Sequence, residues 1–106
     1  MAAETSTLLV LKALSSDKRL QILQWITSPK DHFPPQTDGD LVDDGVCVQS
    51  ITEKIDLSQP TVTSHMRILE KAGLVSSKQI KNWVFYKPNA AYISAALGDL
   101  SKMLSS

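Results

Sequence analysis

The stretch Leu57–Val75, which reads LSQPTVTSHMRILEKAGLV, begins with small polar side chains and continues as an amphipathic pattern. Hydroxyl residues compete with the backbone for hydrogen bonds and are indifferent helix formers, so two helical turns rich in them need an explanation. Hydroxyl and amide groups can contact phosphates or base edges without filling a DNA groove. The stretch therefore has the chemistry of a helix end that another molecule reads.

The same stretch carries the signals of a helix. Ser58 is a good N-cap, Pro60 falls in the first turn, where a missing N–H costs nothing, and Gly73 is placed as a C-cap. Three apolar residues at i, i+4 and i+7 form one buried stripe: Val62, Met66 and Leu69. Five polar residues are left facing outward: Gln59, Thr61, Thr63, Ser64 and Arg67.

The residues before this helix predict its partner in a helix-turn-helix. Residues 46–48 are apolar and favour a short strand, and residues 49–55 form a short helix with Ile51 and Ile55 inward. Asp56 stands where a tight turn is expected, and Asp tolerates the left-handed conformation better than most residues. In such a motif the second helix can enter a DNA major groove.

A β-hairpin is predicted behind the helix-turn-helix. Its strands cover about 74–79 and 83–87 and are joined by a basic tip at 80–82. The aromatic residues of the second strand are expected to pack against the core rather than stack on bases: Trp83, Phe85 and Tyr86. The hairpin would form the wing of a winged helix-turn-helix.

Three further helices are predicted, at about 6–14, 17–27 and 90–105. Ser16 and Asp17 provide a cap and a negative charge at the start of the second. Its core stripe consists of Leu20, Ile22, Leu23 and Ile26. The whole chain, 1–106, is thus expected to be a single mostly α domain with a small β-hairpin, in the order α-α-(β)-α-α-β-β-α.

The first and last helices predict a second copy of the chain as partner. The helix at 6–14 is apolar almost all round, which favours burial on more than one side. Apolar residues of the last helix repeat at spacings of 4, 3 and 4, as in a seam for another helix. The expected dimerisation residues are Leu8, Leu11, Ile93, Leu97, Leu100 and Leu104.

The segment 28–45 holds three of the five prolines, two of the four glycines and five aspartates, which predicts a loop insertion. Its length inside a compact domain indicates a functional or mobile segment. His32 and the aspartates could be interpreted as a cation site, but no ordered ligand spacing supports this, and a solvated acidic loop is favoured. Such a loop could also keep one edge of the protein away from DNA.

Charge is balanced overall but unevenly placed, with 11 basic and 11 acidic residues in 106. Residues 1–45 hold four basic and seven acidic side chains, whereas residues 46–106 hold seven and four. Between 58 and 87, five basic residues accompany one acidic residue, Glu70. A local basic face of this kind matters more to a polyanionic partner than the total charge does.

Enzyme motifs are missing from the sequence, including G-x-S-x-G, H-E-x-x-H and a glycine-rich phosphate loop. We therefore expect neither an enzyme nor a cofactor. The single cysteine, Cys47, fits a reducing compartment. No secretory signal is apparent and no apolar run approaches the roughly 20 residues that span a bilayer, so a cytoplasmic protein without membrane contact is expected.

The chain resembles the ArsR/SmtB family of bacterial winged-helix repressors in three stretches, LKALSSDKRLQILQWI, SITEKIDLSQPTVTSHMRILEKAGLV and KNWVFYKPN. The family typically shows A-L-S-D-P-T-R-L-x-I-L, a recognition helix L-S-Q-x-x-V-S-x-H-L-x-x-L-x-x-A-G-L-V and a wing strand W-x-Y-Y. The match covers nearly everything outside 28–45, and its recognition-helix part is the specific one.

The resemblance implies a homodimer, paired through the first and last helices, that binds double-stranded operator DNA. It implies repression, because a protein bound at a promoter blocks polymerase, and release by an unknown small effector. The implied DNA-facing residues of the second helix are Ser58, Gln59, Thr61, Thr63, Ser64, His65 and Arg67. The implied contacts from the wing tip are Lys78, Lys81 and Asn82. His65 is also interpreted as a packing or hydrogen-bonding residue of its helix in preference to a metal ligand.

Departures from the family pattern predict that its usual metal sites are missing. Many members bind metal through the two cysteines of a C-V-C motif, but in this chain Gln49 stands where the second cysteine would be, after Cys47. Others use Asp and His of the last helix, where residues 90–106 provide only Asp99. Lys81 replaces the usual glycine of the wing tip, which leaves the turn type open.

Alternative interpretations remain at this stage. Cys47 is expected to be a buried small apolar residue, yet a thiol- or metal-responsive repressor that uses it stays an alternative. A second alternative is a winged-helix module that binds protein instead of DNA. The zero net charge and the small number of arginines, only Arg19 and Arg67, favour this alternative.

Overall fold

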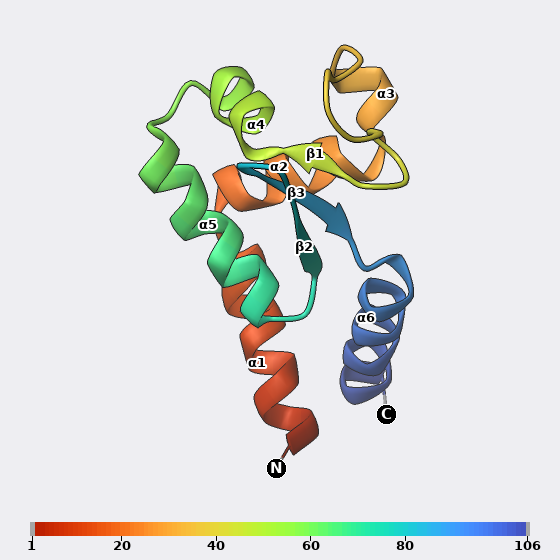
Figure 1. The fold of residues 1–106 in the computed structure, drawn as a ribbon. Coiled ribbons are helices and arrows are strands. Elements are labelled where there is room, and N and C mark those ends of the chain that lie inside the picture. Colours follow the sequence, from red (N-terminus) through yellow and green to blue (C-terminus); the bar gives the residue numbers. More distant parts are fainter. Residues whose placement is uncertain (1, 106) are drawn as a thin grey trace.

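The computed structural model describes residues 2–105, with side chains from residue 6 onward. The chain is mostly helical with one small antiparallel sheet, as the sequence predicts (Figure 1). The elements in chain order are α1 (Ala2–Leu14), α2 (Asp17–Thr27), α3 (Pro29–His32), β1 (Val46–Cys47), α4 (Val48–Ile55), α5 (Gln59–Lys71), β2 (Val75–Ile80), β3 (Trp83–Pro88) and α6 (Ala90–Ser105).

The helix-turn-helix consists of α4 and α5, which pack against each other. α4 ends at Ile55, and its C-cap residue Asp56 adopts the left-handed backbone conformation with φ 59° and ψ 48°. α5 begins after the N-cap residue Ser58, and Gly73 follows its end with φ +85°. The turn and both ends of α5 therefore lie where the sequence predicts them.

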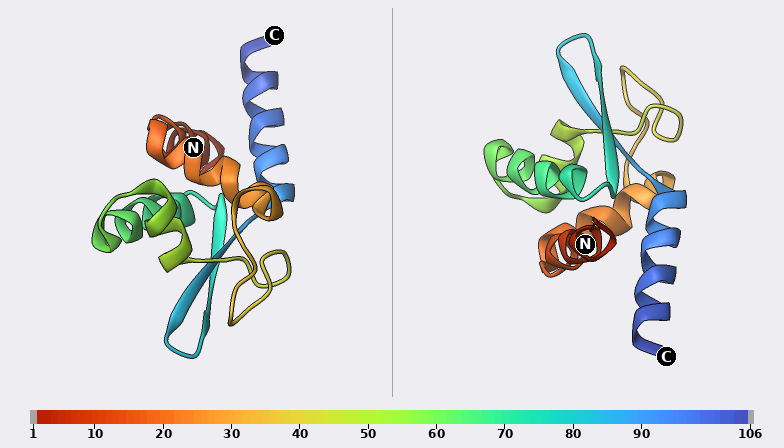
Figure 2. Two further views of the ribbon diagram at one scale, coloured as in Figure 1. Left: turned by 90° about the horizontal axis from the view of Figure 1, so that it is seen from above. Right: turned by 90° about the horizontal axis from the view of Figure 1, so that it is seen from below.

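The wing is the antiparallel pair β2 and β3. Ile80 lies opposite Trp83, so that Lys81 and Asn82 form a two-residue tip, and Lys81 has φ 55°. β1 adds a third strand beside β3, pairing Val46 with Tyr86. The hairpin and α6 project from opposite sides of the molecule (Figure 2).

The core lies between the helices and the sheet. α5 contributes its predicted stripe, and the buried residues of the other elements close around it. The largest fully buried side chains are Ile22, Ile26, Val46, Ile51, Val62, Met66, Leu69, Leu74, Val75 and Phe85.

Three predictions about the N-terminal half are wrong in detail. α1 begins at Ala2 rather than near Ser6, because Ala and Glu favour helix. The segment expected to be a loop contains the four-residue α3, whose first residue, Pro29, already has a helical φ. Leu20, expected in the core, is 52% exposed and lines an open groove with Leu23 and Ile93, since α2 buries only one of its faces.

The segment 28–45, hereafter the acidic segment, is fastened beyond α3 to β1 and the wing. The Gln36 side chain accepts from the Cys47 amide at 2.7 Å and donates to the Gly45 carbonyl at 3.1 Å. Gly45 has φ +105°, and a Cβ there would collide with the Tyr86 carbonyl, so only glycine allows this close approach. The acidic segment is therefore an ordered element beside the wing.

We predict that Leu69→Ala lowers the free energy of unfolding by about 2–5 kcal/mol, because it leaves a cavity under α5. Its neighbour Ile68 is 42% exposed, whereas Leu69 is fully buried. Ile68→Ala is the matched control and should cost less than about 1 kcal/mol. Urea unfolding followed by circular dichroism measures both, and equal losses would contradict the assigned face of α5.

Candidate nucleic-acid interface

The N-terminal end of α5 stands free at the edge of the molecule (Figure 1). Ser58 caps it, accepting from the Thr61 amide at 3.4 Å, and the two hydroxyl groups lie 2.8 Å apart. Pro60 occupies the first turn. Because the stripe on the opposite face is fully buried, the rotation of α5 about its axis is fixed and its polar face is turned to solvent.

Five of the seven predicted DNA-facing residues of α5 and its cap are exposed: Ser58, Gln59, Thr61, Ser64 and Arg67. Thr63 and His65 are half-buried. Within residues 6–105, the side chains of Gln59, Ser64 and Arg67 have no hydrogen-bond partner, so their donors and acceptors are available to a ligand. The N-terminal end of a helix also favours an approaching phosphate.

His65 is turned towards the body of the protein. Its Nδ1 lies 3.1 Å from a terminal nitrogen of the Arg19 guanidinium, which can only donate, so Nδ1 is the acceptor. Arg19 also donates through Nε to the Ala13 carbonyl at 2.7 Å and through its other terminal nitrogen to the Lys12 carbonyl at 3.2 Å. One side chain of α2 thus joins the end of α1 to the middle of α5.

Desolvation lowers the pKa of His65 below its usual value, and the positive charge of Arg19 lowers it further. The carboxylate of Asp17 acts weakly in the opposite direction. Nothing in the spacing of α2 marks Arg19 as a partner of α5, so this contact could not be predicted from the sequence.

The predicted basic residues of the wing are exposed but already form ion pairs with the acidic segment. Lys81 Nζ lies 2.9 Å from an Asp38 carboxylate oxygen, and Lys78 Nζ lies 2.5 Å from one of Asp44. The hydrogen bond from Lys78 is the main reason why the pKa of Asp44 is below its usual value. Asn82 is exposed at the tip. The opposite charges of the two segments were visible in the sequence, but their pairing was not.

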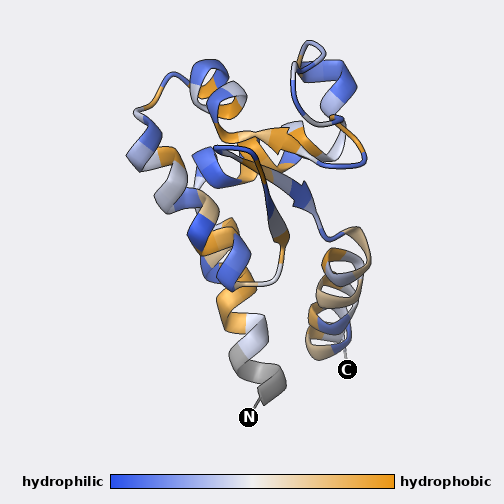
Figure 3. Ribbon diagram, viewed as in Figure 1, coloured by the Kyte–Doolittle hydropathy of each residue, from blue (hydrophilic) through white to orange (hydrophobic). Residues whose placement is uncertain are grey.

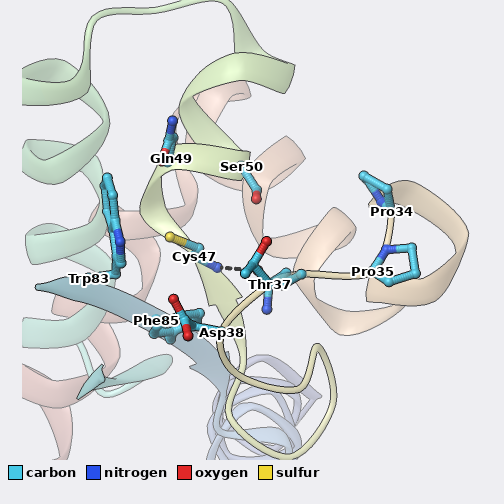
Figure 4. Close-up of a pocket in the computed structure, with 10 residues that line it drawn as sticks. Pro34, Pro35, Thr37, Asp38, Cys47, Gln49, Ser50, Trp83 and Phe85 are labelled. Atoms are coloured by element: carbon cyan, nitrogen blue, oxygen red, sulfur yellow. Dashed lines mark hydrogen bonds between the residues drawn. The ribbon is translucent and has the colours of Figure 1, made fainter. Parts of the chain in front are cut away.

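A cavity of about 400 Å³ lies between the wing, the start of α4 and the acidic segment (Figure 4). Cys47, Trp83 and Asp38 are among its lining residues. Cys47 is a free, buried thiol, as expected, whereas Trp83 is 38% exposed and so packs less completely than predicted. Phe85 and Tyr86 are buried, in agreement with the expectation.

In the part of the chain that the structure describes, no three His, Cys, Asp or Glu side chains are arranged to hold a metal ion.

Large apolar side chains remain exposed on α1 and α6, two helices that contact each other through Thr7 and Met103. Figure 3 colours several residues of both helices as hydrophobic. The large exposed residues of these helices are Leu8, Leu11, Tyr92, Leu97, Met103 and Leu104. Of the other predicted dimerisation residues, Leu100 is half-buried and Ile93 packs against the core of its own chain.

None of the helices within residues 2–105 combines the length and apolarity that a membrane span requires.

The chain is similar in sequence and in fold to known regulatory proteins. Residues 43–77 match the family described as "Bacterial regulatory protein, arsR family". The chain is 40% identical over 95 residues to YbzH, an uncharacterized HTH-type transcriptional regulator of Bacillus subtilis, covering 90% of this chain and 91% of the relative.

Two solved structures share the fold. An ArsR-like transcriptional regulator from Rhodococcus superposes with a TM-score of 0.71 at 18% identity, over 97% of this chain and 83% of that one. A homodimeric winged helix-turn-helix DNA-binding domain from Mycobacterium bovis superposes with a TM-score of 0.66 at 20% identity, over 95% and 82%.

We predict that the contribution of His65 to stability depends on pH. Its pKa is lowered in the folded chain, so between that lowered value and about 6.5 the unfolded chain binds more protons. The stabilisation is complete above pH 6.5 and disappears as the pH falls through the folded value. Urea unfolding from pH 7.5 to 5 should show wild type and His65→Gln converging in stability as the pH falls. A difference that stays constant over this range would contradict the assignment.

Proposed function

The chain belongs to the ArsR family of bacterial regulatory proteins, and we propose that it binds a specific double-stranded operator as a homodimer and represses transcription until a small effector releases it. Its family and fold make it a transcriptional regulator with a winged helix-turn-helix DNA-binding domain. Sequence specificity, the dimer, repression and the effector are the parts that we propose.

The observation that carries the proposal is the exposed polar end of α5 on a helix whose other face is fully buried. Gln59, Ser64 and Arg67 reach solvent without hydrogen-bond partners among the described residues, so they can bind base edges or phosphates without breaking a hydrogen bond. Thr61 and Thr63 lie on the same turns, and Ser58 adds a hydroxyl at the cap. We propose that this face enters the major groove and that Lys78, Lys81 and Asn82 approach the adjacent backbone.

A dimer is supported by the exposed leucines of α1 and α6. Leu97 is 48% exposed and Leu104 is 78% exposed, although both have the size and apolarity of core residues. The homodimeric Mycobacterium bovis domain with the same fold adds support. We propose pairing through residues 6–14 and 90–105, which would present two recognition helices to major grooves about 34 Å apart on one face of the duplex.

Repression follows from the geometry proposed for the complex, because a dimer that covers a promoter excludes polymerase. Release needs an effector with different affinities for the DNA-binding arrangement and for another arrangement of the two subunits. Such an effector need not touch α5. It need only change the distance between the two recognition helices.

The double variant Gln59→Ala, Ser64→Ala tests base reading. We expect it to weaken binding to the operator by roughly 2–4 kcal/mol while leaving random-sequence binding within about threefold of wild type. The operator is first selected from a random DNA pool, and both duplexes are then titrated by fluorescence anisotropy at several salt concentrations. Equal losses on both duplexes would contradict base reading by this face, and a protein that retains no DNA at low salt would instead favour a module that binds protein.

The substitution Leu97→Glu tests the dimer. It should weaken dimerisation by about 3 kcal/mol or more, because it places a carboxylate in an apolar interface on both chains. Val42 in the acidic segment is exposed to a similar degree, 45% against 48%, so Val42→Glu is the matched control and should leave the dimer intact. Sedimentation equilibrium gives the association constants, and a monomeric wild type would refute the proposed assembly.

A further inference from the structure

The acidic segment contacts each basic side chain of the wing. Asp38 pairs with Lys81 at the tip, Asp44 pairs with Lys78 on β2, and the backbone carbonyl of Asp43 accepts from Lys87 on β3 at 3.2 Å. These lysines are the only charged residues in the stretch 75–88. Each lysine of the wing therefore has an oxygen of the acidic segment as its partner.

Contacts that do not involve the lysines hold the acidic segment in this place. Gln36 fastens it to the Cys47 amide and bonds to the carbonyl of Gly45 within the segment, and Gly39 lies against the Phe85 ring, as the contact that an added Cβ would make there indicates. The Asp40 carboxylate accepts from the amides of Val42 and Asp43 at 2.9 and 2.8 Å. The backbone of the acidic segment therefore keeps its carboxylates beside the wing even when a lysine side chain swings away.

This arrangement weakens the attraction between the wing lysines and an approaching DNA phosphate. Each lysine that neutralises a phosphate normally releases about one condensed counterion, which drives sequence-independent binding. A lysine already paired with a fixed carboxylate must give up that pair, and the carboxylate is then left near the phosphate, where the two charges repel. The pairs need not be strong for this, since Lys81 and Lys78 are 72% and 57% exposed and can exchange partners.

We propose that Asp38 and Asp44 compete with DNA phosphates for Lys81 and Lys78, and so limit the sequence-independent affinity of the protein for DNA. The inference rests on the proposed function, because it assigns residues that tune the same interface. The acidic segment then leaves recognition to α5, because the wing lysines add little general attraction to the duplex.

The test uses the full chain and a random-sequence duplex of about 30 base pairs, so that no operator is needed. Asp38→Asn should raise affinity at about 50 mM salt by roughly three- to tenfold and steepen the slope of log K against log salt by up to about one unit per bound subunit. Asp31→Asn is the matched control. It removes one exposed carboxylate of the same segment that has no lysine partner among the described residues, and should change affinity by less than about twofold.

A double-mutant cycle shows whether the gain acts through the lysine. In a Lys81→Gln background, Asp38→Asn should give no more than the Asp31→Asn effect, because no cation is left to release. Asp44→Asn with Lys78→Gln repeats the cycle for the second pair, and asparagine keeps an oxygen for the Asp40 amide that Asp44 binds at 2.7 Å. Thermal unfolding by circular dichroism establishes that each variant is folded at the titration temperature.

The outcomes separate the two hypotheses. If wild type binds the duplex and Asp38→Asn behaves like Asp31→Asn, or its gain persists undiminished in Lys81→Gln, the inference is overturned and the proposed function stands. If neither wild type nor Asp38→Asn binds the duplex in a salt-dependent way, the proposed function is overturned and the inference with it.

Discussion

Burial of one face of α5 is the constraint on which the other features depend. Val62, Met66 and Leu69 are each fully buried, and together they fix both the depth of the helix and its rotation about its axis. A shift of one residue would bring polar side chains into the core, where each would need a hydrogen-bond partner that the described core does not offer. The polar N-terminal end is exposed because the apolar face leaves it no other orientation.

Much of this arrangement can be predicted from sequence because it rests on local rules. The cap at Ser58, the left-handed Asp56 and the apolar spacing of α5 each depend on a few neighbouring residues, and the structure has all three as expected. Leu20 shows where such rules stop. Its spacing fits the stripe of α2, but only the packing of α6 against the body decides that this position borders an open groove.

Contacts between distant segments escaped the sequence analysis for the same physical reason. The acidic segment and the wing have opposite charges, yet Asp38 and Lys81 are 43 residues apart, and only the path from Gln36 through Gly45 into β1 brings them together. Arg19 and His65 are 46 residues apart and meet because α2 packs against α5. The exposure of the polar face of α5 could be predicted from its own segment, whereas the contacts of Arg19, Asp38 and Asp44 could not.

The contacts of Arg19 bear on how a change in the proposed dimer could reach DNA. Its guanidinium spans the last carbonyls of α1 and the ring of His65, so α1 and α5 are linked by three hydrogen bonds through one planar group. A guanidinium holds its donors in a fixed fork, and the stripe of α5 is already immobilised in the core. A rotation of α1 at the proposed subunit interface would therefore carry α5 with it as one body, rather than bend the chain between them. In this arrangement the proposed effector would act on the separation of two rigid recognition surfaces, and the polar face proposed to read the bases would keep its shape in both states.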